Sequence, residues 1–322
     1  LRQRFQGKTS FIPYTCHAAV LFVDLSGYSR IAAAIAHKGA HALSSVVNSY
    51  LSRILQIVHN HGGDVVKFAG DAVLVVWEGE EKDIELNVLC AAQCVTELQE
   101  KAGAHPVEGT SLVFKIHCGI CSGQVESEIF KATTYAHMQR LYHFVGGDAL
   151  AEISELVDLA KAGETCISDE CAEHLGDRGR YTDLSDFEGA KLLTTLRVEE
   201  SMSTRMETHI DTAMTNRLVR RDMAVEEEFI HPSVLKLLSH GGLSPTQIAQ
   251  MRNLCVLFIA MTSNGSPVNW LMEVQSVLDN NRCPIVQIID DDKGVQIVAA
   301  INLYEVSKAK QVSLLYLFAI CR

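Results

Sequence analysis

Apolar and polar positions change their period several times along the first 200 residues of the chain. An apolar run over residues 17–24 ends in an acid and predicts a buried strand. Residues 25–29 read as a turn, and helical spacing begins at Ile31. Over residues 40–61 apolar positions recur three and four residues apart, which predicts a long amphipathic helix ending at Gly62-Gly63.

The pattern then predicts a hairpin of strands 64–69 and 72–77, joined at Gly70-Asp71. A helix over 83–101, a pair of strands at 112–120 and 124–129, a helix over 148–162 and a strand at 165–168 follow. Helices interspersed with hairpins predict an α+β sandwich, in which the helices pack on one sheet.

The opening pattern recurs near the end of the chain. Residues 256–260 match residues 20–24, and residues 271–286 match residues 51–66, with a shorter first helical segment. A repeat this long predicts a domain duplication. We therefore expect a first domain over residues 1–200, a polar linker with some helix over 201–250, and a partial, degenerate second domain over 251–322. Since the chain begins at Leu1 and the second copy stops at Arg322, we expect a piece of a longer protein.

Composition narrows the classes of partner. The net charge is −11, from 39 acidic and 28 basic residues, which argues against a nucleic-acid partner. No apolar run approaches the roughly 20 residues that span a bilayer. Ten scattered cysteines favour a reducing, cytoplasmic location. Cys118 and Cys121 have the spacing of half a metal or redox site, but a strand would point them to opposite faces, which favours buried free thiols.

Two carboxylates form the main candidate site. Asp24 ends the first strand and Asp71 lies in the turn of the following hairpin, so adjacent strands would bring both to one point at the sheet edge. Carboxylates without a nearby histidine suit a hard divalent cation such as Mg²⁺. The turn after Asp24 leads into a helix, whose N-terminal N–H groups would cradle phosphate oxygens. Taken singly, either acid could instead be a helix cap or a turn residue.

These segments resemble a known family. Phe22-Val-Asp24-Leu-Ser-Gly27 and Gly63-Asp-Val-Val-Lys67-Phe-Ala-Gly-Asp71 are similar to the two metal-site segments of class III nucleotidyl cyclases. Within that family they look most like the first cyclase domain of bicarbonate-responsive soluble adenylyl cyclases. The resemblance covers residues 15–200 well and residues 251–305 weakly.

The resemblance implies a ferredoxin-like cyclase sandwich that pairs with a second cyclase domain, in the same or another chain, with ATP at the interface. Two Mg²⁺ or Mn²⁺ ions held by Asp24, Asp71 and the carbonyl of Leu25 would promote attack of the ribose 3′-hydroxyl on the α-phosphate, giving cyclic AMP and pyrophosphate. The residues assigned to the nucleotide phosphates are Ser26, Gly27, Tyr28, Ser29, Gly70 and His117.

Several positions depart from the family pattern. The Asn and Arg that stabilise the transition state in symmetric cyclases align with Ala151 and Glu155, so a homodimer of the first domain should be a poor catalyst. The second domain carries Ala260 where the first has Asp24, and Gln287 where the purine-recognising Lys is expected. This asymmetry is typical of a tandem cyclase with one working site.

Two basic residues keep alternative roles. In soluble adenylyl cyclases a lysine at the position of Lys67 helps to bind bicarbonate, but its companion arginine aligns with Ser154; Lys67 could equally pair with Asp64 or cap the hairpin. His117 aligns with a basic residue that meets the triphosphate, and lies two residues after Lys115 on the same strand face. It could contact phosphate or be a satisfied core histidine.

The sequence therefore predicts an adenylate cyclase module. A catalytically silent cyclase-homology module that binds nucleotide or a partner domain is one alternative. Guanylate cyclase activity is another, because the purine-reading positions lie in the degenerate copy.

Overall fold

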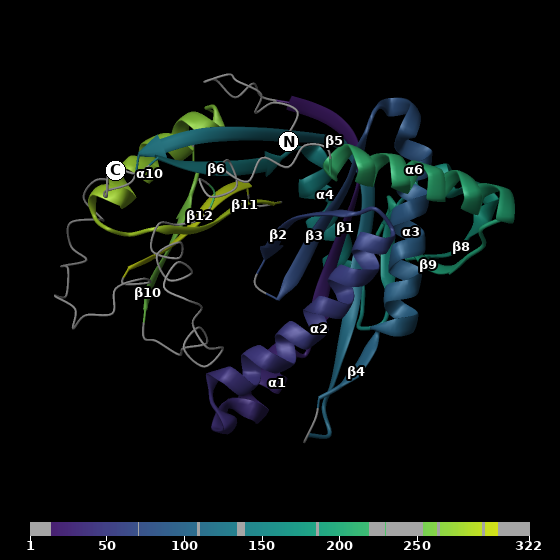
Figure 1. The fold of residues 1–322 in the computed structure, drawn as a ribbon, viewed down its shortest axis with the longest axis horizontal. Helices are drawn as coiled ribbons and strands as arrows, with labels where there is room; N and C mark the ends of the chain where they lie inside the picture. Colours follow the sequence, from purple (N-terminus) through teal and green to yellow (C-terminus); the bar gives the residue numbers. More distant parts are fainter. Residues whose placement is uncertain are drawn as a thin grey trace.

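The chain forms a large sheet and a small sheet, with helices on both faces of the large one (Figure 1). The predicted α+β class is confirmed. This computed structural model describes residues 14–69, 71–107, 110–133, 139–184, 187–218, 229, 254–262, 265–291 and 294–301.

Residues 14–101 follow the predicted order of elements. The strands are β1 Tyr14–Ser26, β2 Asp64–Ala69, β3 Ala72–Gly79, β4 Ala104–Pro106, β5 Val113–Thr133, β6 Gln139–Gly146, β7 Thr165–Ser168, β8 Gly179–Asp183, β9 Ala190–Leu196, β10 Cys255–Ala260, β11 Ile285–Asp291 and β12 Gly294–Ile301. The α-helices are α1 Tyr28–Ile35, α2 Ala40–Asn60, α3 Ile84–Lys101, α4 Asp148–Leu159, α5 Asp169–Leu175, α6 Glu200–Leu218 and α10 Pro267–Asn280. Of these elements, β4, β6, α5, β8 and β9 were not predicted.

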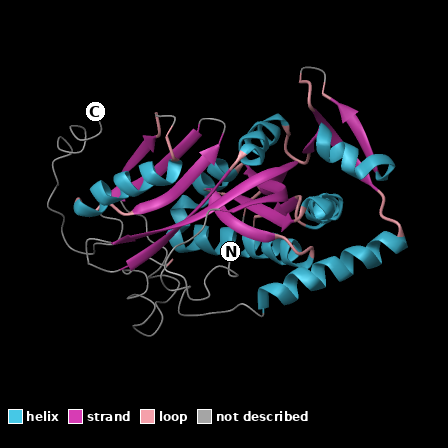
Figure 2. Ribbon diagram, turned by 90° about the horizontal axis from the view of Figure 1, so that it is seen from above, coloured by secondary structure: helices cyan, strands magenta, loops and turns pink. Residues whose placement is uncertain are grey.

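Strand β1 lies at the centre of the large sheet, whose order is β2-β3-β1-β5-β7-β9-β8. Its side chains alternate between two buried clusters. Leu21 and Val23 pack under α1, α2 and α3, whereas Ala18 and Val20 pack under α4. Because both faces are covered, the strand reads as the continuous apolar run seen in the sequence. Figure 2 shows the strands between the layers of helices.

The predicted pair of strands at 112–120 and 124–129 is wrong. These residues form the single strand β5, which pairs with β1 along its first part and with β6 beyond it. Two glycines of this strand serve close packing. A Cβ on Gly119 would lie 3.1 Å from the backbone N of Val157, and one on Gly123 would lie 3.4 Å from the Cβ of Ala149. Both neighbours belong to α4, so small residues let this helix approach the sheet.

Cys118 and Cys121 are buried free thiols that point to opposite faces, as predicted. Cys118 packs in the cluster under α3, and the Sγ of Cys121 donates to the carbonyl of Ala149 at 3.0 Å. Burial raises the pKa of both thiols. Neither has the exposed thiolate character that redox or metal chemistry requires.

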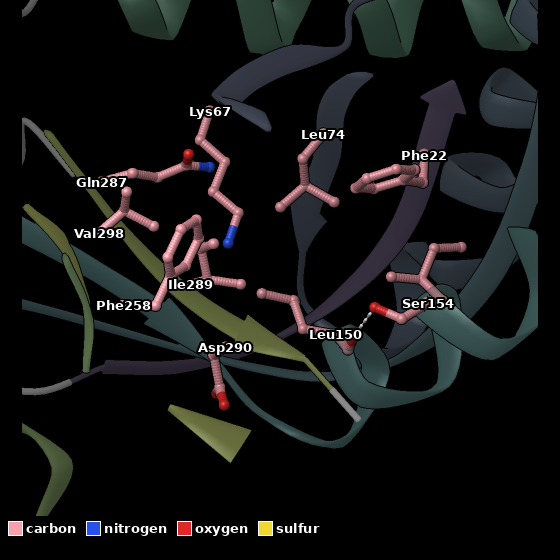
Figure 3. A pocket seen from close by; sticks show the side chains of 11 residues that line it. Phe22, Lys67, Leu74, Leu150, Ser154, Phe258, Gln287, Ile289, Asp290 and Val298 are labelled. Carbon is pink, nitrogen blue, oxygen red and sulfur yellow. Dashed lines mark hydrogen bonds between the residues drawn. The ribbon is translucent and has the colours of Figure 1, made fainter. Parts of the chain in front are cut away.

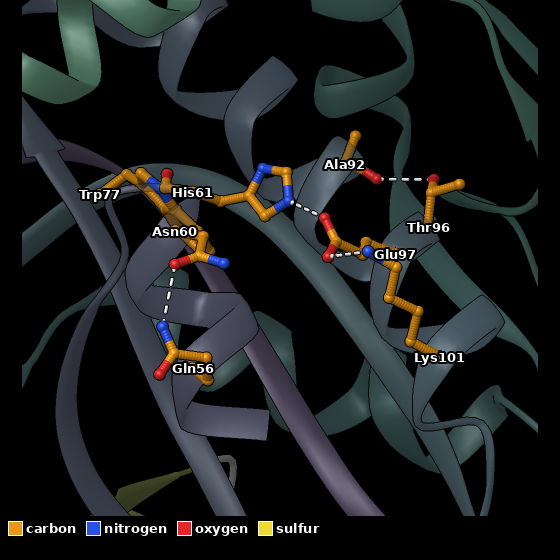
Figure 4. Close-up of polar contacts among 8 residues, drawn as sticks. All are labelled: Gln56, Asn60, His61, Trp77, Ala92, Thr96, Glu97 and Lys101. Atoms are coloured by element: carbon orange, nitrogen blue, oxygen red, sulfur yellow. Dashed lines mark hydrogen bonds and ion pairs between the residues drawn. The ribbon is translucent and has the colours of Figure 1, made fainter. Parts of the chain in front are cut away.

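A polar cluster fixes the turn between α2 and β2 (Figure 4). The indole Nε1 of Trp77 donates to the carbonyl of His61 at 2.7 Å, and the His61 ring lies 2.8 Å from Glu97. Lys101 donates to the other oxygen of Glu97 at 2.7 Å. The ammonium of Lys101 and then the His61 ring lower the pKa of Glu97. These contacts join α2 and α3 to β3, which leads back to the hairpin turn carrying Asp71.

Helix α6 forms the start of the segment predicted as a linker, and it packs on the first copy. Met206 is buried, and the His209 ring lies 2.8 Å from the buried amide of Asn87 on α3. A Cβ on Gly62 would lie 3.1 Å from Ile210. The domain boundaries near residues 200 and 250 stay a prediction. Among the helices that the structure describes, none is long and apolar enough to cross a bilayer.

The small sheet repeats the topology of the first hairpin and strand. Its order, β10-β12-β11, matches β1-β3-β2, with antiparallel pairing throughout. The strand register shifts between Val65 and Lys67 in β2, and between Ile285 and Gln287 in β11. The same irregularity at the same place supports the duplication. Helix α10 covers one face of the small sheet, together with Phe130 and other apolar residues of β5 and β6.

The two hairpins differ at their tips. In the first, Ala69 pairs with Ala72 and only Gly70 and Asp71 lie between them. In the second, the corresponding pair is Ile289 and Gln296, and the ladder continues to Asp291 and Gly294. The second hairpin therefore extends beyond the position at which the first one turns.

Candidate active site

The two predicted metal carboxylates lie at the same end of neighbouring strands. Val23 of β1 pairs with Val73 of β3, so Asp24, the next residue of β1, lies beside the start of β3. Asp71 precedes β3 in the hairpin turn. The two charges interact, since Asp24 raises the pKa of Asp71. The antiparallel register thus brings the two acids together, whereas Gly70 lies outside the described residues.

Asp24 is held through both carboxylate oxygens. The backbone N–H of Leu25 donates to Oδ1 at 2.9 Å, and Nε2 of His117 lies 3.3 Å from Oδ2. Ser26 Oγ lies 2.8 Å from Nδ1 of the same imidazole. Ser26 and His117, both predicted as phosphate ligands, therefore contact each other, and His117 also contacts Asp24.

The surroundings of Asp71 disfavour its negative charge, and a bound cation would stabilise that charge. Its partial burial raises the pKa of its carboxyl group, and the charge of Asp24 raises it further, while its own backbone N–H and His117 oppose the shift. Two negative groups held close together in a partly buried place destabilise each other unless a positive ion lies between them. The chemistry of these donors fits Mg²⁺ or Mn²⁺, which take oxygen ligands.

The protein supplies only part of a coordination sphere. Among the described residues, no three or more His, Cys, Asp or Glu side chains are arranged as a metal site. A cation at Asp24 and Asp71 would thus also need backbone, water or substrate oxygens. This is the usual situation for Mg²⁺ in phosphoryl-transfer sites, where one or two carboxylates combine with substrate phosphates.

A helix N-terminus lies directly after Asp24. Strand β1 extends through Leu25 and Ser26, and α1 begins at Tyr28 rather than at Ile31, so the turn is shorter than predicted. Gly27 makes this reversal with φ of +88°, a left-handed conformation that favours glycine. No side chain caps the helix. The amides of Tyr28 and Ser29 are therefore placed as in an anion-binding helix start.

The positions that should stabilise the transition state lie on α4. Ala151 and Glu155 are both exposed on this helix, and neither side chain carries the amide or guanidinium donors expected there. A methyl group and a carboxylate cannot stabilise negative charge on a phosphate. These positions would have to be complemented by another copy or another chain.

A cavity of about 330 Å³ lies between the two copies (Figure 3). The lining includes three pairs of residues that occupy matching places in the repeat: Phe22 and Phe258, Lys67 and Gln287, Leu74 and Val298. The remaining lining residues are Leu150, Ile153, Ser154, Ile289 and Asp290. Of the described residues that line it, none is Asp24 or Asp71, so the cavity is separate from the carboxylate pair.

The predicted regulatory residue Lys67 extends into this cavity, and Ser154 lines it from the other side (Figure 3). The hydroxyl of Ser154 donates to the carbonyl of Leu150 at 3.3 Å. The amide of Gln287 donates to the carbonyl of Phe68 at 3.1 Å, which joins β11 to β2. Asp290, which the sequence did not single out, also lines the cavity. Residue type alone could not predict that Asp290 would line the cavity, because this depends on the longer second hairpin.

Known proteins are similar to this chain in sequence and in fold. The family described as the adenylate and guanylate cyclase catalytic domain matches residues 13–184. The chain belongs to this family. This match confirms the class III cyclase resemblance, and the matched range spans the positions of both candidate metal carboxylates.

Among relatives of this cyclase domain, adenylate cyclase type 10 of Rattus norvegicus is 29% identical over 157 residues, covering 47% of this chain and 9% of the relative. The Homo sapiens protein of the same name is 26% identical over 172 residues, covering 52% and 10%. The matched part of the chain thus spans about a tenth of the length of these relatives.

Solved structures with a similar fold include the guanylate cyclase domain from Catenaria anguillulae in complex with GTP, with a TM-score of 0.48 and 18% identity, covering 58% of this chain and 100% of that one. The adenylyl cyclase CyaB from P. aeruginosa has a TM-score of 0.45 and 20% identity, covering 59% and 98%.

Proposed function

We propose that this cyclase domain is the metal-binding half of an adenylate cyclase, which converts ATP to cyclic AMP and pyrophosphate. One observation carries the proposal: the pairing of β1 with β3 places Asp24 beside the strand end that Asp71 precedes, at the uncapped start of α1, and the charge of Asp24 raises the pKa of Asp71. The adenylate cyclase type 10 relatives favour ATP over GTP as the substrate.

In this proposal Asp24, Asp71 and the carbonyl of Leu25 hold two Mg²⁺ or Mn²⁺ ions. Bound there, the ions would neutralise phosphate charge and favour ionisation of the ribose 3′-hydroxyl. The backbone amides of Tyr28 and Ser29 would orient the triphosphate, so that the 3′-oxygen displaces pyrophosphate from the α-phosphorus. The domain contributes mainly orientation and charge stabilisation, as in other phosphoryl transfers.

The site needs a partner cyclase domain. Exposed Ala151 and Glu155 offer no donor for the transition state, so a second domain, in this chain or in another, would have to supply one. The same two residues favour a second candidate function, a silent cyclase-homology module that binds nucleotide without turning it over.

The proposal is tested by measuring cyclic nucleotide formation by the full chain with ATP or GTP and Mg²⁺ or Mn²⁺. We expect cyclic AMP formation that Asp71→Asn abolishes and that Asp64→Asn, at the far end of the same hairpin, leaves intact. Cyclic GMP alone would identify a guanylate cyclase. Nucleotide binding without any product, in the full chain and with an added partner domain, would favour the silent module.

A further inference from the structure

His117 lies directly opposite Asp24 in the antiparallel pairing of β1 with β5. Alternate residues of a strand share a face, so Ser26 projects to the same side as Asp24. The side chain of His117 is mostly buried, with 16% of its surface exposed. Its two ring nitrogens are therefore directed at neighbours in the sheet.

One tautomer of the His117 imidazole satisfies both of its contacts. When Nε2 carries the hydrogen, it faces Oδ2 of Asp24 across 3.3 Å. Nδ1 is then an acceptor, and the hydroxyl of Ser26 donates to it at 2.8 Å. The N–H of Leu25 engages Oδ1. Each oxygen of Asp24 thus has one neighbour that limits rotation of the carboxylate and leaves lone pairs for a cation.

We infer that His117 is a positioning residue for Asp24, and that Ser26 holds the imidazole in the required tautomer. This inference rests on the proposed function, because it assigns the pair a role in metal binding. Groups that orient a ligating side chain in this way typically contribute 10- to 100-fold to metal affinity. It also leaves phosphate contact to the backbone amides of α1, because the side chain of His117 is engaged with Asp24 and that of Ser26 with His117.

The chain offers a matched control for this arrangement. A second serine–histidine pair lies further along the same sheet, where Ser127 Oγ is 2.9 Å from Nε2 of His143. Ser127 is on β5 and His143 is on β6, far along the strands from Asp24. A role in folding alone would make the two pairs equivalent, whereas a role at Asp24 would distinguish them.

The test measures Mn²⁺ affinity of the full chain without nucleotide, by electron paramagnetic resonance and calorimetry. We expect His117→Leu to weaken binding by about 10- to 100-fold, and Ser26→Ala to weaken it less. His117→Gln, whose amide can still donate to Asp24, should retain most of the affinity, and Ser127→Ala should not change it. Equal Mn²⁺ affinity in wild type and folded His117→Leu would overturn the inference.

Asp24→Asn separates this inference from the proposed function. If Asp24→Asn binds Mn²⁺ as tightly as wild type, the carboxylate pair is not a metal site and the proposed function fails. If Asp24→Asn loses Mn²⁺ and His117→Leu does not, only the positioning role fails. Should His117→Leu not fold, nitrogen-15 spectra of wild-type His117 above neutral pH decide the question: the Nε2–H tautomer is expected, and the Nδ1–H tautomer would overturn the inference.

Discussion

Gly27 offers a direct test of the backbone cradle at the start of α1. An alanine there would have free space, because nothing lies within 4 Å of the added Cβ, so its cost is the left-handed backbone at φ +88°. That conformation costs a non-glycine residue about 1 to 2 kcal/mol. The loss of unfolded-state freedom offsets about 0.4 to 1 kcal/mol of this. We expect Gly27→Ala to destabilise the fold by about 1 kcal/mol, measured by urea unfolding.

The functional effect should be larger than the stability effect. The variant can relieve its strain by shifting the amides of Tyr28 and Ser29, and a misplacement of about 1 Å can cost roughly 100-fold in rate. We expect kcat/KM for ATP, and the affinity for the nucleotide, to fall about tenfold or more. Steady-state kinetics and equilibrium binding of ATP with Mn²⁺ would measure both.

Gly163 provides the matched control. It also has a positive φ, +94°, with nothing within 4 Å of an added Cβ, but it lies in the turn between α4 and β7. Gly163→Ala should cost a similar amount of stability and leave ATP binding and turnover unchanged. If Gly27→Ala behaves like Gly163→Ala in every assay, the amides at the start of α1 do not hold the phosphates.

Three further substitutions test the packing and charges of the first copy. Gly63→Ala should destabilise the fold by about 1 to 3 kcal/mol in urea, because the new Cβ would lie 2.8 Å from the Trp77 ring; unchanged stability would contradict this packing. Glu97→Gln should lose roughly 1 kcal/mol or less at neutral pH. Since Lys101 helps to lower the pKa of Glu97, this contribution is present above the carboxyl's ordinary pKa and disappears as the pH falls through the lowered value; a difference that persists in acid would refute it. Asp71→Asn should raise the stability of the metal-free chain at neutral pH, because the penalty of its charge develops between the ordinary and the raised pKa. In thermal unfolding, added Mn²⁺ should then stabilise wild type and not the variant.

Most helices and strands of the first 100 residues, and the closeness of the two carboxylates, could be predicted from local sequence patterns. Asp24 ends an apolar run and Asp71 lies in a two-residue turn, so the strand order alone places them together. The CxxC cysteines were correctly judged from strand alternation. In each case the prediction needed only a local sequence pattern or the pairing of two neighbouring strands.

Features that depend on packing between distant elements could not be predicted in the same way. Gly119 and Gly123 look like turn residues until α4 is known to lie against β5. The contact of His117 with Asp24 needs the register of β1 on β5, which no local pattern gives. With that register, the two residues would have been recognised as neighbours, and the choice between phosphate ligand and core histidine would have gained a third possibility.

The longer tip of the β11–β12 hairpin affects whether the second copy could be redesigned to carry a carboxylate pair like that of the first. Replacing Ala260 by aspartate would restore only one acid of a second site. The paired strands continue past the level at which the first hairpin turns, so the position that matches Asp71 lies within the paired strands and not in a turn. Hairpin length as well as residue identity thus separates the two copies, and a designer seeking a symmetric two-site enzyme would have to shorten the second hairpin as well as change its side chains.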